Sequence, residues 1–354
     1  MYVYVGTYTE PPGGRASGIE VFRLDEETGS LEHVQTALGV ANPSFLVLHP
    51  REHHLYAGER YLYAVNEGRE GKVTAYARDS DNGNLSLINH QSSHGVDPCY
   101  VSTDIEGRTV FVANYTSGSI AALPILDDGS LGPASSTVQH HGSSVVAGRQ
   151  EGPHAHMIAP TPDGAAVLVT DLGTDEVVIY RFESGNLERV GAVAVEAGSG
   201  PRHFAFSPDA TSLYVLNELS STLDVFTYDS GQLAFPYRQT LTTLPEGFAG
   251  TNSTAHVQVS PDGRFVYASN RGHDSIAIFA VEPVSGELSQ AAITLTRGEE
   301  PRNFGLSPDG LWLLAANQNS DTIVTFRRDS GTGMLEHVGD PVPVQTPVCV
   351  VFAH

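Results

Sequence analysis

Residues 200–233 read GPRHFAFSPDATSLYVLNELSSTLDVFTYDSGQL, a unit that recurs along the whole chain. This unit predicts three short strands, at His203–Phe206, Leu213–Leu216 and Thr222–Tyr228, and a fourth that opens at Gly231–Leu233. The strands run or alternate apolar with β-branched and aromatic residues, and Gly, Pro, Asp and Ser fill the gaps between them. No part of the unit has helical spacing. It therefore predicts a four-stranded antiparallel meander.

A Gly-x-Leu tripeptide identifies the same point of the meander in each repeat. Its glycines are Gly29, Gly83, Gly129, Gly185, Gly231, Gly286 and Gly333. A period of about 50 residues built from four short strands is typical of a β-propeller blade. The seven tripeptides therefore predict an all-β, seven-bladed β-propeller in which residues 1–354 form one domain.

The two ends of the chain are predicted to share a blade. A residue pair ending in Pro starts most of the innermost strands, and the last such pair, Thr346-Pro347, follows the last Gly-x-Leu tripeptide. No such pair precedes the first tripeptide. We therefore expect Pro347–Phe352 to supply the innermost strand of the first blade, beside Met1–Val5. This pairing leaves no open sheet edge between the first and last blades.

The composition favours a single cytoplasmic domain. Hydrophobic residues make up 40% of the 354 residues, enough for a packed core at this length, and no apolar run approaches a membrane span. Met1 leads directly into a strand, so we expect no secretion signal. Cys99 and Cys349 fall in innermost strands separated by one blade, too far apart for a disulfide. We expect both to be buried free thiols, which fits a reducing compartment.

The charge is strongly acidic, with a formal net charge of −22 and Lys72 as the only lysine. Acid-rich, lysine-poor surfaces suit folding in concentrated salt, where the repulsion between carboxylates is screened. We therefore predict a salt-adapted, halophilic protein. The same charge argues against nucleic acid or an anionic membrane as a partner.

Two segments depart from the simple repeat. His54–Arg60 (HLYAGER) and Tyr61–Glu67 (YLYAVNE) are near copies in tandem, although one second strand is enough for the blade. We assign Tyr61–Glu67 to the sheet, because it ends in the same Asn-Glu pair as Asn217-Glu218, and the other copy to an extended turn. The longest segment without strand character is Gln139–Gly152, and a long loop in a compact repeat protein is often functional.

Strand order predicts where the chemistry lies. In an up-and-down blade the start of the first strand and the end of the second lie on one face, and the first strand lines the axis. The starts of the first strands carry His154, His156, Arg202, His203, His256, Arg302 and Asn303. The ends of the second strands carry Glu67, Asp171, Glu218, Arg271 and His273. The opposite face offers only turn residues such as Asp209, Asp262 and Asp309.

Arginines and histidines gathered at one mouth of an acidic protein predict an anion-binding pocket. The planar fork of arginine suits a carboxylate or phosphate, and a histidine can take or deliver a proton near neutral pH. Because propellers also use inner-strand polar residues to hydrogen-bond neighbouring blades, we expect about half of these residues to be structural. The spacing supports no metal site, and we expect no cofactor.

Four motifs resemble the seven-bladed propeller lactonase family over essentially the whole chain. They are RQEGPHAH (149–156), GPRHFAFSPD (200–209), YVLNEL (214–219) and DGRFVYASNRGHDSIAIF (262–279). The family includes propeller-type bacterial 6-phosphogluconolactonases and fungal carboxymuconate lactonizing enzymes. The resemblance implies a metal-independent site built from one histidine, two arginines and a glutamate.

Matching the motifs implies that Arg202, Arg271 and Glu218 are catalytic, together with one histidine. Alignment on the Pro-Asp turns selects His156, whereas counting from Pro153 selects His154. The resemblance further implies hydrolysis of a small anionic sugar-acid lactone, with 6-phosphogluconolactone as the first candidate. Expected substrate-binding residues are Arg149, His203, His256, Arg302 and Asn303. The alternatives are a cycloisomerase acting on a muconate-type dicarboxylate and a non-catalytic scaffold whose rim binds protein.

Overall fold

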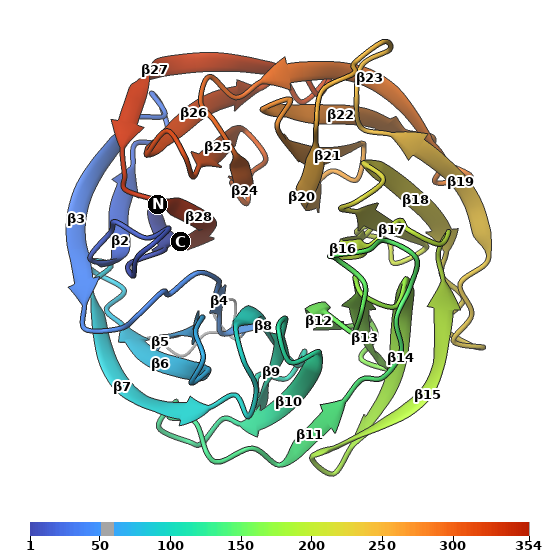
Figure 1. Cartoon of the computed structure of the whole chain (residues 1–354). Coiled ribbons are helices and arrows are strands. Elements are labelled where there is room, and N and C mark those ends of the chain that lie inside the picture. Colours follow the sequence, from blue (N-terminus) through green and yellow to red (C-terminus); the bar gives the residue numbers. More distant parts are fainter. Residues whose placement is uncertain (51–59, 354) are drawn as a thin grey trace.

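Seven sheets surround a central axis (Figure 1) in the computed structural model, which describes residues 1–50 and 60–353. In those ranges 28 strands form seven four-stranded antiparallel sheets, and there is no helix. Each sheet is one blade, and the strands are given below from the axis outward. The prediction of a seven-bladed propeller is confirmed.

The first four blades follow one another along the chain. Blade one contains β28 (Pro347–Ala353), β1 (Tyr2–Thr7), β2 (Gly18–Leu24) and β3 (Leu31–Leu38). Blade two contains β4 (Leu46–Leu48), β5 (Arg60–Asn66), β6 (Lys72–Arg78) and β7 (Leu85–Ser92). Blade three contains β8 (Pro98–Thr103), β9 (Thr109–Asn114), β10 (Ser119–Pro124) and β11 (Ser136–Gln139). Blade four contains β12 (Ala155–Pro160), β13 (Val167–Asp171), β14 (Glu176–Glu183) and β15 (Asn186–Ala194).

Three further blades complete the ring. Blade five contains β16 (Pro201–Phe206), β17 (Ser212–Asn217), β18 (Thr222–Thr227) and β19 (Tyr237–Thr242). Blade six contains β20 (Ser253–Val259), β21 (Phe265–Arg271), β22 (Ser275–Val281) and β23 (Leu288–Leu295). Blade seven contains β24 (Pro301–Leu306), β25 (Trp312–Asn317), β26 (Thr322–Arg328) and β27 (Leu335–Pro343).

The ring closes through the chain ends, as predicted. β28 pairs antiparallel with β1, with Tyr2 opposite Ala353 and Val5 opposite Val350. The two ends therefore lie side by side near the axis in Figure 1. Cys349 of β28 and Cys99 of β8 are buried free thiols, which also agrees with the prediction.

Blade five corrects one detail of the strand assignment. Its fourth strand does not open at Gly231–Leu233 but begins at Tyr237. Phe235 turns into the core and stacks on Tyr228 with ring centroids 5.2 Å apart, and Pro236 has no N–H to donate to a ladder. These two residues delay the pairing of β18 with β19.

The tandem copies of blade two are resolved in part. Tyr61–Asn66 lies in β5, so the assignment of the second copy to the sheet is confirmed. Except for Arg60, the first copy lies outside the described residues.

Burial explains why these segments form strands at these positions. Every residue of β9 and of β17 is buried, because each second strand is covered by a neighbouring blade on both faces. The outermost strands are the most exposed, and β19 has no buried residue. Burying one large apolar side chain contributes about 1.5–3 kcal/mol. The inter-blade layers are therefore the core.

Six of the seven Gly-x-Leu glycines lie against the preceding blade, and Gly231 is the exception. Gly129 has φ +78°, and a Cβ there would lie 2.1 Å from the Tyr61 ring of blade two. The Tyr63 hydroxyl donates a 3.2 Å hydrogen bond to the Gly129 carbonyl. Tyr4 of blade one bonds Gly83 of blade two in the same way at 2.7 Å. The repeat marker thus fixes how adjacent blades pack, which is why it recurs.

None of the described residues forms a helix long and apolar enough to cross a membrane.

We expect the melting temperature to rise as sodium chloride increases from low to molar concentration. The chain has 41 acidic residues against 19 lysines and arginines, and salt screens the resulting repulsion. Thermal melts in sodium chloride test this, with sodium sulfate as the comparison, because sulfate also strengthens apolar burial. A flat or falling melting temperature in sodium chloride would contradict salt adaptation.

Candidate active site

Each innermost strand presents one side chain to the same level of the axis. In blade five Pro201 pairs with Asn217 and His203 with Leu216, so Arg202 sits in a bulge between them. Bulges re-aim side chains and are common beside active sites. The register shifts at the same point in six of the seven blades, and blade two contributes Ser44, which lies two residues before β4. These positions form a ring around the axis, defined here as the channel ring. Its members are Ser44, Cys99, His156, Arg202, Ala255, Arg302 and Val348.

The strand register chooses between the two histidines that the sequence left open. Ala155 pairs with Asp171 just as Pro201 pairs with Asn217 in the next blade. His156 therefore takes the channel-ring position equivalent to that of Arg202. His154 lies two residues earlier, just before β12. A pocket on the axis is lined by His156 but not by His154.

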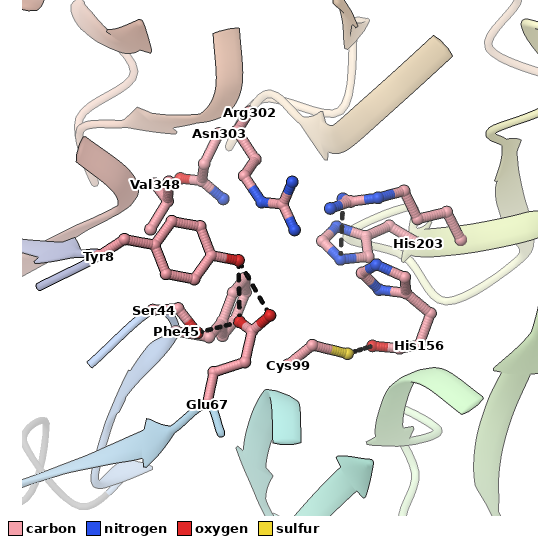
Figure 2. A pocket seen from close by; sticks show the side chains of 11 residues that line it. Tyr8, Ser44, Phe45, Glu67, Cys99, His156, His203, Arg302, Asn303 and Val348 are labelled. Carbon is pink, nitrogen blue, oxygen red and sulfur yellow. Dashed lines mark hydrogen bonds between the residues drawn. The ribbon is translucent and has the colours of Figure 1, made fainter. Parts of the chain in front are cut away.

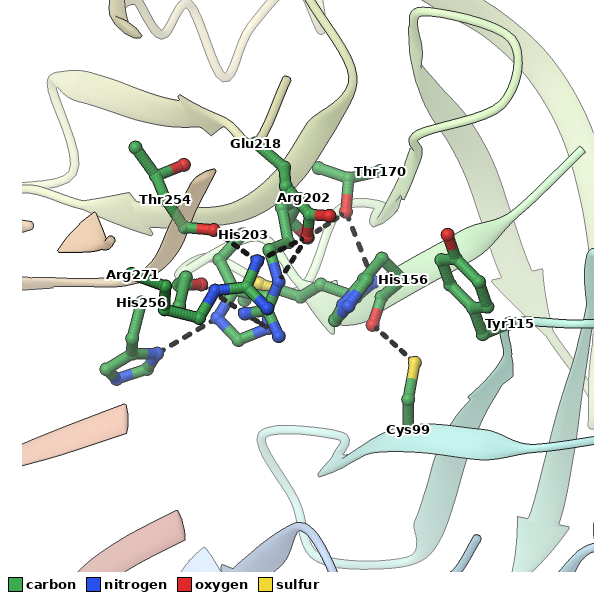
Figure 3. A network of polar contacts seen from close by, with 12 residues as sticks. Cys99, Tyr115, His156, Thr170, Arg202, His203, Glu218, Thr254, His256 and Arg271 are labelled. Atoms are coloured by element: carbon green, nitrogen blue, oxygen red, sulfur yellow. Dashed lines mark hydrogen bonds and ion pairs between the residues drawn. The ribbon is translucent and has the colours of Figure 1, made fainter. Parts of the chain in front are cut away.

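A buried carboxylate organises the basic side of this mouth (Figure 3). Glu218 follows the end of β17 and pairs through Oε2 with Arg202 Nε and Arg271 Nη2, both at 2.9 Å. Its Oε1 accepts a short hydrogen bond from Arg149 Nη2. Glu218, Arg202 and Arg271 are all less than a tenth exposed. The structure thus brings together four of the residues predicted from sequence.

The three guanidinium groups keep Glu218 ionised. Burial alone would raise the pKa of this carboxyl, but Arg271 and Arg202 outweigh burial and hold its pKa far below the usual range. Burial and the neighbouring Arg271 lower the pKa of Arg202 to about 9, so that it stays protonated at neutral pH. One carboxylate among three cations leaves this side of the mouth positively charged.

Arg202 is held on two edges and open on the third. Nε bonds Glu218, and Nη1 donates to the Ala255 carbonyl and, at 3.3 Å, to His203 Nε2. Nη2 has no hydrogen-bond partner among residues 1–50 and 60–353. It is therefore the donor that Arg202 offers to a ligand.

His156 lies beside Arg202 without a side-chain partner. The residue is 4% exposed, and its buried Nδ1 has no hydrogen-bond partner within the described chain. Burial, then the Arg202 charge, lower the pKa of His156 well below its ordinary value. The imidazole is consequently neutral at neutral pH and able to accept a proton.

His154 is engaged elsewhere. Its ring stacks on Tyr115 with centroids 4.5 Å apart, and its Nδ1–H donates to the Tyr115 carbonyl at 3.0 Å. Its backbone N–H is fixed by Asp171. These contacts give His154 a structural place at the rim.

His203 and His256 form a buried hydrogen-bonded pair beside Arg202. A guanidinium can only donate, so His203 Nε2 accepts from Arg202, and its Nδ1–H donates to His256 Nδ1 at 2.9 Å. Tyr100 packs edge-on against His203 and Phe304 against His256, each with ring centroids 5.1 Å apart. Burial lowers the pKa of both histidines, that of His256 to about 3. Both are neutral supports beside the guanidinium.

The opposite wall of the pocket contains groups that the sequence analysis missed or left open (Figure 2). The Tyr8 hydroxyl donates to the Glu67 carboxylate at 2.9 and 3.0 Å, and Ser44 Oγ donates to the same group at 2.5 Å. Burial, with Glu67 adding to it, raises the pKa of Tyr8 above its ordinary value. Tyr8 therefore remains a neutral hydroxyl.

The second corners give a signal that would have found Tyr8 and Tyr115. In four blades the second strand ends at Asn, and in blade six Asn270 directly precedes the last strand residue, Arg271; the residue after the Asn stands at the corner, and Tyr8 follows Thr7 at the same position of blade one. These corner residues are Tyr8, Glu67, Tyr115, Glu218, Arg271 and Gln318. Blade one was overlooked because its corner carries Thr instead of Asn.

Arg302 projects into the pocket from β24. Its guanidinium lies over the Tyr8 ring, 5.5 Å from the centroid, and has no hydrogen bond or ion pair with any residue that the structure describes. The adjacent Asn303 accepts a 2.9 Å bond from the Val350 N–H through Oδ1. The carbonyl side of this amide is thereby fixed.

Two predicted corner residues lie away from the pocket. Asp171 accepts a 2.6 Å bond from His140 Nδ1, and His140 Nε2 accepts from the Tyr180 hydroxyl. His273 bonds Ser275 at 2.8 Å and packs edge-on against Phe248. All of these contacts hold strands and loops together.

The long loop contributes one side chain to the site. Arg149 lies between β11 and β12, is 40% exposed, and reaches Glu218 and, at 3.5 Å, the Tyr115 hydroxyl. It is the most solvent-accessible member of the Glu218 cluster.

Within the described chain, no group of three or more His, Cys, Asp or Glu side chains is placed to hold a metal ion. Cys99 lines the pocket, but burial, followed by the nearby Glu67 charge, raises the pKa of its thiol. It is thus an un-ionised side chain at neutral pH.

Comparison with known proteins gives a consistent result. Residues 2–352 match a family model described as "Lactonase, 7-bladed beta-propeller". A 6-phosphogluconolactonase of Bacillus subtilis is 37% identical over 351 residues, covering 99% of this chain and 98% of the relative. One of Formosa agariphila with the same name is 34% identical, covering 94% of each chain. A Pseudomonas aeruginosa structure titled periplasmic gluconolactonase superposes with a TM-score of 0.91 at 35% identity, covering 100% of this chain and 99% of that one.

Proposed function

The chain belongs to the lactonase family of seven-bladed β-propellers, and from this membership we propose that it hydrolyses the lactone of a phosphorylated sugar acid, 6-phosphogluconolactone first among them. The names of the Bacillus and Formosa relatives support this substrate. The Pseudomonas protein is named for the lactone without phosphate. Both names refer to an enzyme that opens a lactone ring.

One observation supports hydrolysis above all: a neutral, unpartnered imidazole beside an open guanidinium edge. His156 supplies the proton acceptor. Arg202 Nη2 supplies a cationic donor from the channel-ring position of the adjacent blade. Opening an ester needs a base for water and a donor for the developing oxyanion.

The proposed reaction proceeds through a tetrahedral intermediate. Water attacks the lactone carbonyl carbon while His156 takes one of its protons, and the carbonyl oxygen becomes an oxyanion that Arg202 stabilises. The intermediate then collapses, the bond from the carbonyl carbon to the ring oxygen breaks, and His156 returns the proton to the departing ring oxygen. The products are a hydroxyl group and a carboxylic acid, and His156 is neutral again; the acid then releases its proton to water and becomes a carboxylate.

Glu218 acts through the arginines in this scheme. Its two oxygens accept from Arg202, Arg271 and Arg149, and this fixes the Arg202 fork with Nη2 free. Arg271 is held further by the Thr254 carbonyl at 2.7 Å. Glu218 and Arg271 are therefore positioning residues that pre-organise the oxyanion donor.

The charge of the site suits an anionic substrate. Four guanidinium groups, those of Arg149, Arg202, Arg271 and Arg302, face the carboxylates of Glu218 and Glu67, with Glu300 3.8 Å from Arg271 at the rim. The site is thus cationic in a chain of net charge −22. A small anion is attracted here and repelled by the rest of the surface.

We expect the purified protein to open 6-phosphogluconolactone faster than the spontaneous reaction and to leave a muconate-type dicarboxylate unchanged. A pH-stat that records acid release measures the first, with the enzyme-free rate subtracted, and ultraviolet absorbance measures the second. The panel includes plain sugar lactones. Turnover of the muconate would favour the cycloisomerase, and no turnover of any compound would favour a non-catalytic scaffold.

A further inference from the structure

The pocket has a second set of unused donors, on the wall opposite the Glu218 cluster. Arg302 occupies the channel-ring position two blades after Arg202, with Ala255 between them. Unlike Arg149, Arg202 and Arg271, it pairs with no carboxylate among the described residues. A guanidinium that lines a pocket without a partner is built to receive an anion from outside.

Asn303 adds a neutral donor next to it. Because the Val350 N–H fixes Asn303 Oδ1, the amide nitrogen Nδ2 has to face the other way. Nδ2 has no partner among the described residues, and Asn303 lines the same pocket, where Figure 2 shows its amide nitrogen on the side of Arg302. Two adjacent residues of one strand thus present N–H groups to the same space.

The oxygens of the neighbouring Glu67 carboxylate already accept hydrogen bonds from the protein. Both oxygens of Glu67 accept from Tyr8, and one also accepts from Ser44. Tyr8 in turn places its ring face under the Arg302 guanidinium and limits its movement. Arg302 is therefore held in position by a ring and keeps its N–H groups free.

We propose that Arg302 and Asn303 form a separate subsite for the phosphomonoester group of the substrate, while His156 and Arg202 act on the lactone. This deepens the proposed function and rests on it, because it assigns the phosphate end and the lactone end of one substrate to two walls of one pocket. The subsite decides between phosphorylated and plain sugar lactones.

The test compares 6-phosphogluconolactone with gluconolactone in the wild type, Arg302→Gln and Arg302→Lys. We expect Arg302→Gln to raise KM for the phosphorylated lactone by about tenfold to a hundredfold, the usual range for losing a charge-assisted contact. Its kcat/KM for gluconolactone should stay within about threefold of wild type. Arg302→Lys keeps the charge but loses the fork, so its KM should lie in between.

Arg69→Gln is the matched control, because Arg69 is an exposed arginine at the second corner of blade two and does not line this pocket. Arg69→Gln should leave KM and kcat/KM unchanged for both lactones. An equal loss on both lactones in Arg302→Gln would overturn the proposal, because Arg302 would then act at the lactone. An unchanged KM for the phosphorylated lactone would overturn it as well.

Inorganic phosphate separates this proposal from the proposed function. We expect phosphate, compared with sodium chloride of equal ionic strength, to raise the melting temperature of the wild type and Arg69→Gln but not that of Arg302→Gln. This result would support the subsite even if no lactone were hydrolysed. An equal rise in all three proteins would overturn it.

Discussion

Replacing Arg202 with glutamine lowers kcat/KM for lactone opening by about a hundredfold to a thousandfold, the cost of removing one oxyanion donor from a pre-organised site. Arg202 is 3% exposed and held by Glu218, the Ala255 carbonyl and His203, so its free Nη2 needs no rearrangement when the oxyanion forms. The effect should fall mainly on kcat, because this contact strengthens in the transition state.

The fold should survive this change. Glu218 keeps Arg149 and Arg271 as partners when Arg202 is lost, so its charge stays paired. Glutamine leaves a smaller void at this position than alanine would. The melting temperatures of the wild type and Arg202→Gln are compared to check the fold. Asp309→Ala is the control on the opposite face, where Asp309 only accepts bonds within its own turn. Equal rates in Arg202→Gln and Asp309→Ala would show that Arg202 is not the oxyanion donor.

The fold was predictable because its sequence markers carry a physical constraint. A Gly-x-Leu glycine such as Gly129 needs both a left-handed φ and room for an aromatic ring of the preceding blade, so no other residue fits there. Proline at the start of an inner strand has no ladder bond to lose. The weak marker was Gly231, where Phe235 and Pro236 delay the fourth strand.

The site was predictable by face but not by individual residue. Strand order brought Arg202, Glu218 and Arg271 together, as predicted, with Arg149 from the long loop. Alignment on the Pro-Asp turns selected His156. Counting from Pro153 selected His154 instead, because Pro153 is not the equivalent of Pro201: Ala155, two residues later, pairs with Asp171 as Pro201 pairs with Asn217.

Side-chain partners decide which polar residues remain free for a ligand, and no spacing in the sequence reveals them. Asp171 and His273 lie at corners equivalent to that of Glu218, yet His140 and Ser275 engage them. Arg302 stayed free because its nearest aromatic neighbour, Tyr8, offers a ring face in place of a carboxylate.

Replacing His156 with glutamine should lower kcat by about a hundredfold to ten-thousandfold, the usual contribution of a general base. His154→Gln is the matched variant two residues away, and it should lose less than about fivefold, because His154 is bound to Tyr115 outside the pocket. Both variants are assayed on the same lactone, and their melting temperatures are compared with the wild type. A larger loss in His154→Gln would transfer the role of base to His154.

The pH profile gives a second, independent signature of His156. The base must be neutral, so activity is complete above its pKa and is lost as the pH falls through it. Burial and the Arg202 and Arg302 charges lower this pKa, and we therefore expect wild-type kcat/KM to remain level well below the ordinary histidine pKa of about 6.5. Arg302→Gln removes one of these charges, so its acid limb should move to higher pH.

Acid unfolding of the protein has to be distinguished from the loss of activity caused by protonation of His156. His203 and His256 are also buried and neutral with lowered pKa values, so protonating them at low pH destabilises the folded state. Rates therefore count only at pH values where the melting temperature stays well above the assay temperature. Within that range, an acid limb at the same pH in the wild type and Arg302→Gln would mean that the titrating base does not face Arg302. The base would then have to be sought outside the channel ring, since every member of the ring borders the same pocket except Ala255.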